Sequence, residues 1–218
     1  MELLRLAKTV YETCNLKGAF KLRSGQTSSE YFDKYQLESR PALLAAIADG
    51  MADLLPIDTR VLAGLEMGGI PVATAISLKT GLPAVFVRKK AKEYGTCKID
   101  EGVEFKGRKV AVIEDVVTTG GAIIDGVRAL REGGALVDTV VCVIDREQGG
   151  AARLGEIGLT LKSLFTASEL RRAAGADHIV VGRSVLEASD PAKAVRDILK
   201  EKPKPASRKG RSAAKGKP

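Results

Sequence analysis

The sequence is poor in the residue types that most often carry catalysis or cross-links. It has one histidine, three cysteines and no tryptophan among 218 residues. The cysteines, Cys14, Cys97 and Cys142, are odd in number and far apart, which argues against a disulfide framework and against a zinc site. This usage is typical of a reducing compartment, so we expect a cytoplasmic location.

Several motifs are also absent. No Ser-His-Asp arrangement can be built from the single histidine, His178, which lies far along the chain from every motif below. The patterns GxxxxGK[ST] and GxGxxG do not occur, which disfavours ordinary nucleotide triphosphatases and dinucleotide-binding folds. No apolar run reaches about 18 residues, and the N-terminus is an amphipathic helix rather than a signal peptide, so we expect no membrane association.

The net charge of +8 is concentrated at one end of the chain. Residues 201–218 carry seven Lys or Arg and one Glu, and residues 1–200 carry a net charge of only +2. This end is rich in Pro, Gly, Ser and Ala, which cannot bury enough apolar surface to offset the entropy of ordering. We therefore predict a disordered basic tail over 202–218. A solvated tail is favoured over a polyanion-binding arm because no aromatic residue is interleaved with the charges, and we expect no nucleic-acid partner.

Apolar runs of strand length alternate with amphipathic segments of helix length. We predict strands over 61–64, 84–88, 110–114, 136–145 and 159–163, short extended pieces over 19–22 and 31–34, and helices over 2–13, 41–55, 70–80, 121–132, 150–156 and from 166. This alternation predicts an α/β fold with a mainly parallel sheet flanked by helices.

Polar features follow four of the predicted strands. They are Glu66–Gly69, Arg88–Lys92, Glu114–Gly121 and Asp145–Arg146. Because ligands of parallel sheets bind beyond the carboxyl ends of the strands, we expect the four features to meet at one edge. The segment 89–107 has no apolar period, and we expect a mobile or functional loop there.

The stretch VAVIEDVVTTGGA at 110–122 predicts a sugar-phosphate site. A short apolar strand leads to two carboxylates, Glu114 and Asp115, and Thr118–Gly121 then open a helix. Outward N–H groups and glycines at a helix N-terminus suit a phosphate, because the dipole is positive there and glycine lets the anion approach. The adjacent carboxylates suit ribose hydroxyls.

Two further segments supply cations. We interpret RKKAKEYGT at 88–96 as a lid that closes over a polyanionic leaving group, rather than as a solvated charged loop. Arg146 in DREQGG has two interpretations, since it can pair with its neighbours Asp145 or Glu147, or clamp a substrate carboxylate in bidentate fashion. The glycines of AGLEMGGIP fit a plain strand-to-helix turn as well as amides that face a pyrophosphate.

Together these segments resemble type I phosphoribosyltransferases and, within them, the orotate phosphoribosyltransferase family. VAVIEDVVTTGG resembles the phosphoribosyl-diphosphate (PRPP) motif of the superfamily. The orotate family is indicated by FKLRSGQTSSEYFD (20–33), GLEMGGIPVA (64–73), VRKKAKEYGT (87–96), VIDREQGG (143–150) and SLFTASEL (163–170). The resemblance covers about residues 1–172.

The resemblance implies transfer of the 5-phosphoribosyl group from PRPP to N1 of orotate, giving orotidine 5′-phosphate and diphosphate in de novo pyrimidine biosynthesis. It implies a type I phosphoribosyltransferase domain over 1–172, with a small hood from about 1–40 and 150–172 and a mobile catalytic loop. It also implies Mg²⁺ carried by PRPP, without direct protein ligands but with water bridges to Glu114 and Asp115. The implied assembly is a homodimer in which loop 88–102 reaches the neighbouring site.

The resemblance also implies three sets of residue roles. The catalytic set is Arg88, Lys89 and Lys92, with Lys92 the principal loop lysine. The PRPP-binding set is Arg23, Arg88, Lys89, Lys92, Tyr94, Glu114, Asp115, Val116, Val117, Thr118, Thr119, Gly120, Gly121 and Ala122. The orotate-binding set is Tyr31, Phe32, Thr118 and Arg146.

Three positions depart from the family pattern. Arg23 stands where many relatives have Lys, and Tyr94 stands where some have His. Gly68 stands where some relatives have a diphosphate-binding Lys. The last change removes one cation and leaves more of the diphosphate to the loop.

Residues 175–201 resemble the last βα unit of orotidine-5′-phosphate decarboxylase, whose Gly-Arg pair, here Gly182-Arg183, contacts the substrate phosphate. The two enzymes act consecutively and are fused in some organisms. One βα unit cannot close a barrel, and the D-x-K-x-x-D motif is absent, so we predict no decarboxylase activity. We interpret 173–201 as a strand–helix extension that is either a decarboxylase remnant or a chance likeness. The remnant would make the decarboxylase a candidate partner.

Two rival functions compete with orotate phosphoribosyl transfer. A phosphoribosyltransferase for another base is disfavoured by Arg146 and by the RKKAKEYG loop. A PRPP-sensing regulator that binds nucleic acid through the tail could dispense with the lid cations, but Arg88, Lys89 and Lys92 are all present.

Overall fold

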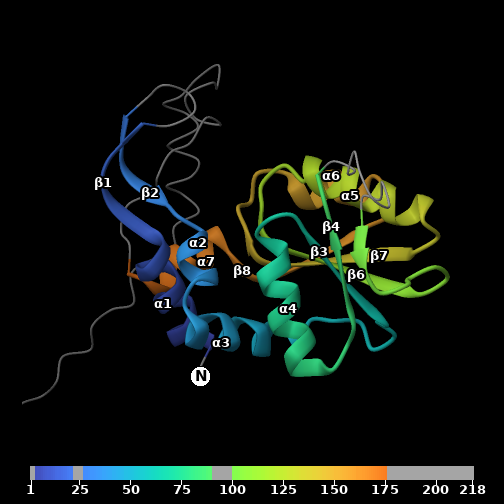
Figure 1. The fold of residues 1–218 in the computed structure, drawn as a ribbon. Helices are drawn as coiled ribbons and strands as arrows, with labels where there is room; N and C mark the ends of the chain where they lie inside the picture. Colours follow the sequence, from blue (N-terminus) through green and yellow to red (C-terminus); the bar gives the residue numbers. More distant parts are fainter. Residues whose placement is uncertain (1–2, 22–26, 90–99, 176–218) are drawn as a thin grey trace, which may run out of the picture. The chain divides into compact units, whose positions relative to one another are not determined.

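The computed structural model describes residues 3–21, 27–89 and 100–175, which fall in the first of two compact units, Met1–Ala176. A six-stranded sheet with the order β5-β4-β3-β6-β7-β8 forms its centre (Figure 1). The strands are β3 (Val61–Leu65), β4 (Ala84–Val87), β5 (Asp100–Gly102), β6 (Lys109–Val117), β7 (Leu136–Asp145) and β8 (Thr160–Thr166). All neighbouring pairs are parallel except β4–β5, so the predicted mainly parallel sheet is confirmed.

Helices cover both faces of this sheet. One face is covered by α3 (Pro41–Ala52) and α4 (Gly69–Thr80), and the other by α5 (Gly121–Glu132) and α6 (Gly150–Gly155). Successive strand residues point to opposite faces, so Leu62 packs in the first apolar cluster while Val61 and Ala63 pack in the second. In the part of the chain that the structure describes, no helix is long and apolar enough to cross a membrane.

The N-terminal segment forms a separate antiparallel ribbon next to the sheet. The ribbon is formed by β1 (Asn15–Lys21) and β2 (Thr27–Phe32). Helix α1 (Leu3–Cys14) precedes it and the short α2 (Tyr35–Glu38) follows it. Helix α1 packs against α7 (Ala167–Ala173), so the first and last described elements lie side by side (Figure 1, blue and orange). The ribbon is longer than predicted. Most of β1 is not buried, so cross-strand pairing defines the strand and the sequence shows no apolar period for it.

Helix α5 and strand β7 have the predicted bounds, whereas β6 is longer than predicted. Val116 and Val117 still pair with Ile144 and Asp145 of β7, so the strand continues past Ile113. The two carboxylates therefore lie inside the strand rather than at its end. The short α2 and the edge strand β5 were not predicted.

Candidate active site

The sheet order brings the four predicted polar features to one edge. Strands β4, β3, β6 and β7 are consecutive neighbours and parallel, so their carboxyl ends align. The hydrogen bonding between β4 and β3 continues beyond the ends of these two strands. The Glu66 N–H donates to the Val87 carbonyl at 2.8 Å, and the Lys89 N–H donates to the Glu66 carboxylate at 3.1 Å. These bonds fix the point where the predicted cationic segment begins.

The carboxylates of β6 have a counter-ion that the sequence did not indicate. Lys34 Nζ lies 2.6 Å from Asp115 Oδ2, and the Asp115 side chain is fully buried. Asp115 Oδ1 also accepts the Val116 N–H at 2.6 Å. The only available signal was that Lys34 directly follows the FKLRSGQTSSEYFD segment. Lys34 therefore stabilises the charge of the buried acid.

A third carboxyl, Glu38, lies against the same acid. Burial, a hydrogen bond with Asp115 and the charge of Asp115 together raise the pKa of Glu38 to about 8, with burial the largest cause. Burial and Asp115 likewise raise the pKa of Glu114 well above its ordinary range. The buried Oε1 of Glu38 has no donor when the group is ionised, but a protonated Glu38 can donate to Asp115. The cluster therefore binds protons near neutral pH.

The turn after β3 lies directly on this cluster. A Cβ at Gly68 would lie 1.7 Å from Asp115 Oδ2, and a Cβ at Gly69 would lie 2.3 Å from the Ile113 carbonyl oxygen. Real Cβ atoms do not approach so closely. Position 68 therefore needs glycine while Asp115 stays in place, and position 69 needs glycine while the β6 backbone stays in place. The absence of a lysine at position 68 thus has a steric reason in this chain.

The predicted phosphate cradle lies at the start of α5. Gly120 has the left-handed φ of 76° and precedes Gly121, the first residue of the helix. Thr118 and Thr119 are exposed. The first N–H groups of a helix have no intrahelical partners, and the helix dipole is positive there. The geometry of 118–122 is therefore suited to an anion.

The loop that carries Arg146 packs against this cradle. The Arg146 N–H donates to the Val117 carbonyl at 2.9 Å, and a Cβ at Gly150 would lie 2.5 Å from the Thr118 carbonyl oxygen. The Arg146 guanidinium lies 5.6 Å from the centre of the Phe32 ring. Burial lowers the pKa of Arg146, and the charge of Arg171 lowers it further. A half-buried cation and an aromatic face thus lie beside the cradle.

A cavity of about 250 Å³ opens between these elements. Its lining is Leu65, Glu66, Val87, Arg88, Lys89, Glu114, Ala122, Asp125 and Gly126. Four of these residues were predicted for the site. Glu66 was predicted at this edge without a role, and Asp125, which lies one turn into α5, was missed.

The chain is similar to known proteins over most of its length. A model of the phosphoribosyl transferase domain matches residues 34–156. An orotate phosphoribosyltransferase of Nocardioides sp. is 54% identical over 173 residues, which are 78% of this chain and 97% of that protein. The chain belongs to the orotate phosphoribosyltransferase family. It is therefore a transferase that moves the phosphoribosyl group of PRPP to orotate in pyrimidine biosynthesis.

Solved structures agree with this membership. The orotate phosphoribosyltransferase of Mycobacterium tuberculosis in complex with PRPP matches with a TM-score of 0.68 and 31% identity, over 78% of this chain and 99% of that one. The UMP synthase of Leishmania donovani matches with a TM-score of 0.68 and 27% identity, over 92% of this chain and 42% of that one. The fold is thus the type I phosphoribosyltransferase fold of the family.

Several residues predicted for this family's site lie outside the described residues. They are Arg23, Lys92 and Tyr94, and the same holds for Cys97, His178, Gly182 and Arg183. Within 3–21, 27–89 and 100–175, no group of three or more His, Cys, Asp and Glu side chains could hold a metal ion. The described cysteines, Cys14 and Cys142, are buried and unpaired, and burial raises the pKa of both thiols.

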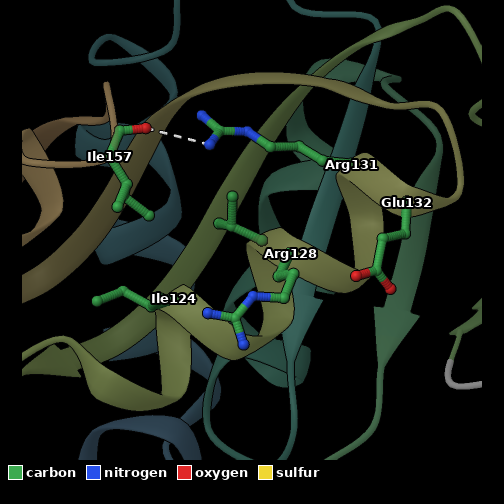
Figure 2. Close-up of a pocket in the computed structure, with 6 residues that line it drawn as sticks. Ile124, Arg128, Arg131, Glu132 and Ile157 are labelled. Atoms are coloured by element: carbon green, nitrogen blue, oxygen red, sulfur yellow. Dashed lines mark hydrogen bonds between the residues drawn. The ribbon is translucent and has the colours of Figure 1, made fainter.

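A second cavity, of about 370 Å³, lies along the other half of α5 (Figure 2). It is lined by Ile124, Val127, Arg128, Arg131, Glu132 and Ile157. Arg131 donates to the Ile157 carbonyl at 3.1 Å and to the Val137 carbonyl at 2.7 Å. This arginine ties α5 to the start of β7 and to the turn after α6. None of the residues predicted for the family's site lines this cavity.

Proposed function

We propose that the sheet edge divides the family's reaction between a donor side on β6 and α5 and an acceptor side on the 145–150 loop. The observation that carries this division is the hydrogen bond from the Arg146 N–H to the Val117 carbonyl, at 2.9 Å. It joins the loop with the free guanidinium to the segment that forms the phosphate cradle. Donor and acceptor would therefore meet above residues 117–118.

On the donor side, Glu114 and Asp115 accept hydrogen bonds from the ribose hydroxyls. The residues 116–122 hold the 5′-phosphate through backbone N–H groups and the hydroxyls of Thr118 and Thr119. Lys34 supports this role because it keeps a positive charge 2.6 Å from Asp115. A buried carboxylate without such a partner would take up a proton and become a poorer acceptor.

The leaving diphosphate is held by the cationic residues around the 250 Å³ cavity, Arg88 and Lys89. Arg23, Lys92 and Tyr94 would contact the same diphosphate. Mg²⁺ carried by PRPP neutralises part of the diphosphate charge when it is bound. Within residues 3–21, 27–89 and 100–175, the buried Oε2 of Glu114 has no hydrogen-bond partner, and such an oxygen can accept from a water of the metal's hydration shell.

On the acceptor side, Arg146 binds the carboxylate of orotate while Phe32 packs against its ring. Tyr31 and Thr118 complete the contacts around the base. Orotate N1 then forms a bond to C1 of the ribose as the bond from C1 to the diphosphate oxygen breaks, and the N1 proton passes to the departing diphosphate. The cations on the leaving group stabilise negative charge where it develops, which lowers the barrier.

We also propose an assembly, a location and a domain boundary for this chain. They are a homodimer in which loop 88–102 serves the neighbouring site, a cytoplasmic location, and a phosphoribosyltransferase domain that ends near 172. The share of this chain that each solved structure matches supports a decarboxylase-like origin of 175–201. The UMP synthase match takes in 92% of this chain, whereas the PRPP-bound orotate enzyme takes in 78%.

The test is an assay of the purified chain with PRPP, Mg²⁺ and one base at a time. Orotate consumption with release of diphosphate is the expected result, and adenine and hypoxanthine should remain unused. Consumption of a purine base would favour the rival transferase. Tight PRPP binding without turnover of any base would favour the PRPP-sensing regulator.

A further inference from the structure

The two acids that flank Arg146 are both engaged elsewhere. The Glu147 N–H donates to Asp145 Oδ1 at 2.8 Å. Glu147 Oε2 accepts the Ser168 N–H at 2.8 Å and the Ser168 hydroxyl at 2.6 Å. Arg171 Nη2 lies 4.0 Å from the same oxygen. The local carboxylates that could have neutralised Arg146 are thus tied to the loop itself and to the first turn of α7.

The backbone of Glu147 makes this arrangement possible. Its φ is 57°, and it is the only non-glycine residue with a positive φ among residues 3–21, 27–89 and 100–175. An L-residue in this conformation is disfavoured, so surrounding contacts must hold it there. The two bonds to Ser168 and the ion pair with Arg171 are such contacts. They direct the carboxylate toward α7.

Among the described residues, the contact recorded for the Arg146 guanidinium is with an aromatic ring. Its guanidinium lies over the Phe32 ring, and the described residues provide no carboxylate that pairs with it. Arginine and a carboxylate attract each other strongly through paired N–H···O bonds. A Glu147 free to move would therefore compete with any carboxylate ligand for the neighbouring guanidinium.

We propose that Glu147 is a positioning residue whose capture by Ser168 and Arg171 keeps Arg146 unpaired and open to the carboxylate of the acceptor. This inference rests on the proposed role of Arg146 and adds the reason for its availability. It also assigns a specificity role to α7, since the helix acts on the acceptor through Glu147. The donor side should be insensitive to this contact.

The experiment is a double-mutant cycle between Ser168→Ala and Glu147→Gln, with Ser168→Thr as the conservative control. Ser168→Ala should raise KM for orotate by about 3- to 10-fold while kcat and KM for PRPP stay within about twofold. Ser168→Thr keeps the hydroxyl and should stay near the wild type. Glu147→Gln should change the wild type by less than about twofold but restore the KM of Ser168→Ala, because an amide does not compete as an anion.

Two results would overturn the inference: an unchanged KM for orotate in Ser168→Ala, or a Glu147→Gln change with the same effect in both backgrounds. If Ser168→Ala folds poorly, Arg171→Gln removes the ion pair with the same carboxylate and is scored by the same cycle. A wild type that consumes no orotate would overturn the proposed function itself. The two failures are therefore distinguishable.

Discussion

Gly68 shows how tightly single residues are constrained around the acid cluster. Its φ of −69° suits any residue, so only the space taken by Asp115 excludes a side chain. Gly68→Ala should lower kcat/KM for PRPP by about 10-fold or more, because the added carbon must displace a buried carboxylate that binds the donor. Steady-state kinetics with a thermal unfolding curve check this.

The matched control is Gly155→Ala. Gly155 is a glycine of α6 whose added Cβ would meet nothing within 4 Å. This variant should keep wild-type kinetics and be neutral or slightly stabilising, because alanine has the higher helix propensity. Wild-type kinetics in Gly68→Ala would mean that Asp115 moves freely and does not hold the donor.

Glu38 makes stability depend on pH at the same cluster. Because the pKa of Glu38 is raised from 4.5 to about 8, the folded protein holds a proton that the unfolded chain releases. The free energy of unfolding of the wild type should therefore fall as the pH rises from about 5 to about 8. Glu38→Gln mimics the protonated form and should lose about 1 kcal/mol less over this range, after allowance for partial exposure.

Urea unfolding at pH 5 and at pH 8 measures this difference. The exposed Glu132→Gln serves as the control for loss of one acidic charge and should follow the wild type. Parallel pH profiles for the wild type and Glu38→Gln would contradict the assignment.

The residues that the sequence predicted and those that it missed differ in a physical way. Thr118, Gly120 and Arg146 were predicted because each lies in a short local pattern that also forms one structural unit. Lys34 and Glu38 were missed because their contact with Asp115 spans about 80 residues and exists only in the folded chain. No local pattern encodes such a pair. The predicted site therefore lacks these two charged groups, and the roles of its residues stay predictions.

At the scale of elements, α7 contacts the acceptor loop through the hydrogen bonds from Ser168 to Glu147. Its N-terminus has a capping box, in which the Glu169 N–H donates to the Thr166 hydroxyl at 3.2 Å and the Thr166 N–H donates to the Glu169 carboxylate at 2.8 Å. Thr166→Ala should lower the free energy of unfolding by about 1 kcal/mol, since one N–H of the first turn loses its acceptor. Denaturant unfolding measures the change.

Thr74→Ala is the matched control for this substitution. Thr74 is an exposed threonine inside α4 whose hydroxyl bonds to the Ile70 carbonyl at 2.8 Å. Alanine has the higher helix propensity, so this variant should be neutral or slightly stabilising. Equal losses in both variants would show that the capping box contributes nothing.

The elements themselves were predictable where burial gives a clear period. The bounds of β7 and α5 were correct because β7 is mostly apolar, with five apolar residues in a row at 140–144, and α5 has one polar and one apolar face. Strand β5 is three residues long and polar, and it is a strand only because it pairs with β4. The end of β6 was wrong for the same reason, since pairing with β7 extends it through two acids.

At the scale of the whole molecule, 173 residues of this chain match 97% of the Nocardioides enzyme. Removal of residues 175–218 should therefore leave kcat/KM for both substrates within about twofold and leave the unfolding midpoint nearly unchanged. The full-length chain, assayed side by side, is the reference. A large loss of activity would show that the decarboxylase-like extension takes part in the transferase.

The central claim is that Arg146 selects the acceptor by its carboxylate, beside a cradle that holds the donor. The most direct measurement is the ratio of kcat/KM for orotate to that for uracil, which lacks the carboxylate, in the wild type and in Arg146→Met. The wild type should prefer orotate strongly, and Arg146→Met should lower this ratio by about 10- to 100-fold with PRPP binding unchanged, as expected for the loss of a charged hydrogen bond. An unaltered ratio in a folded Arg146→Met variant that still binds PRPP would contradict the account.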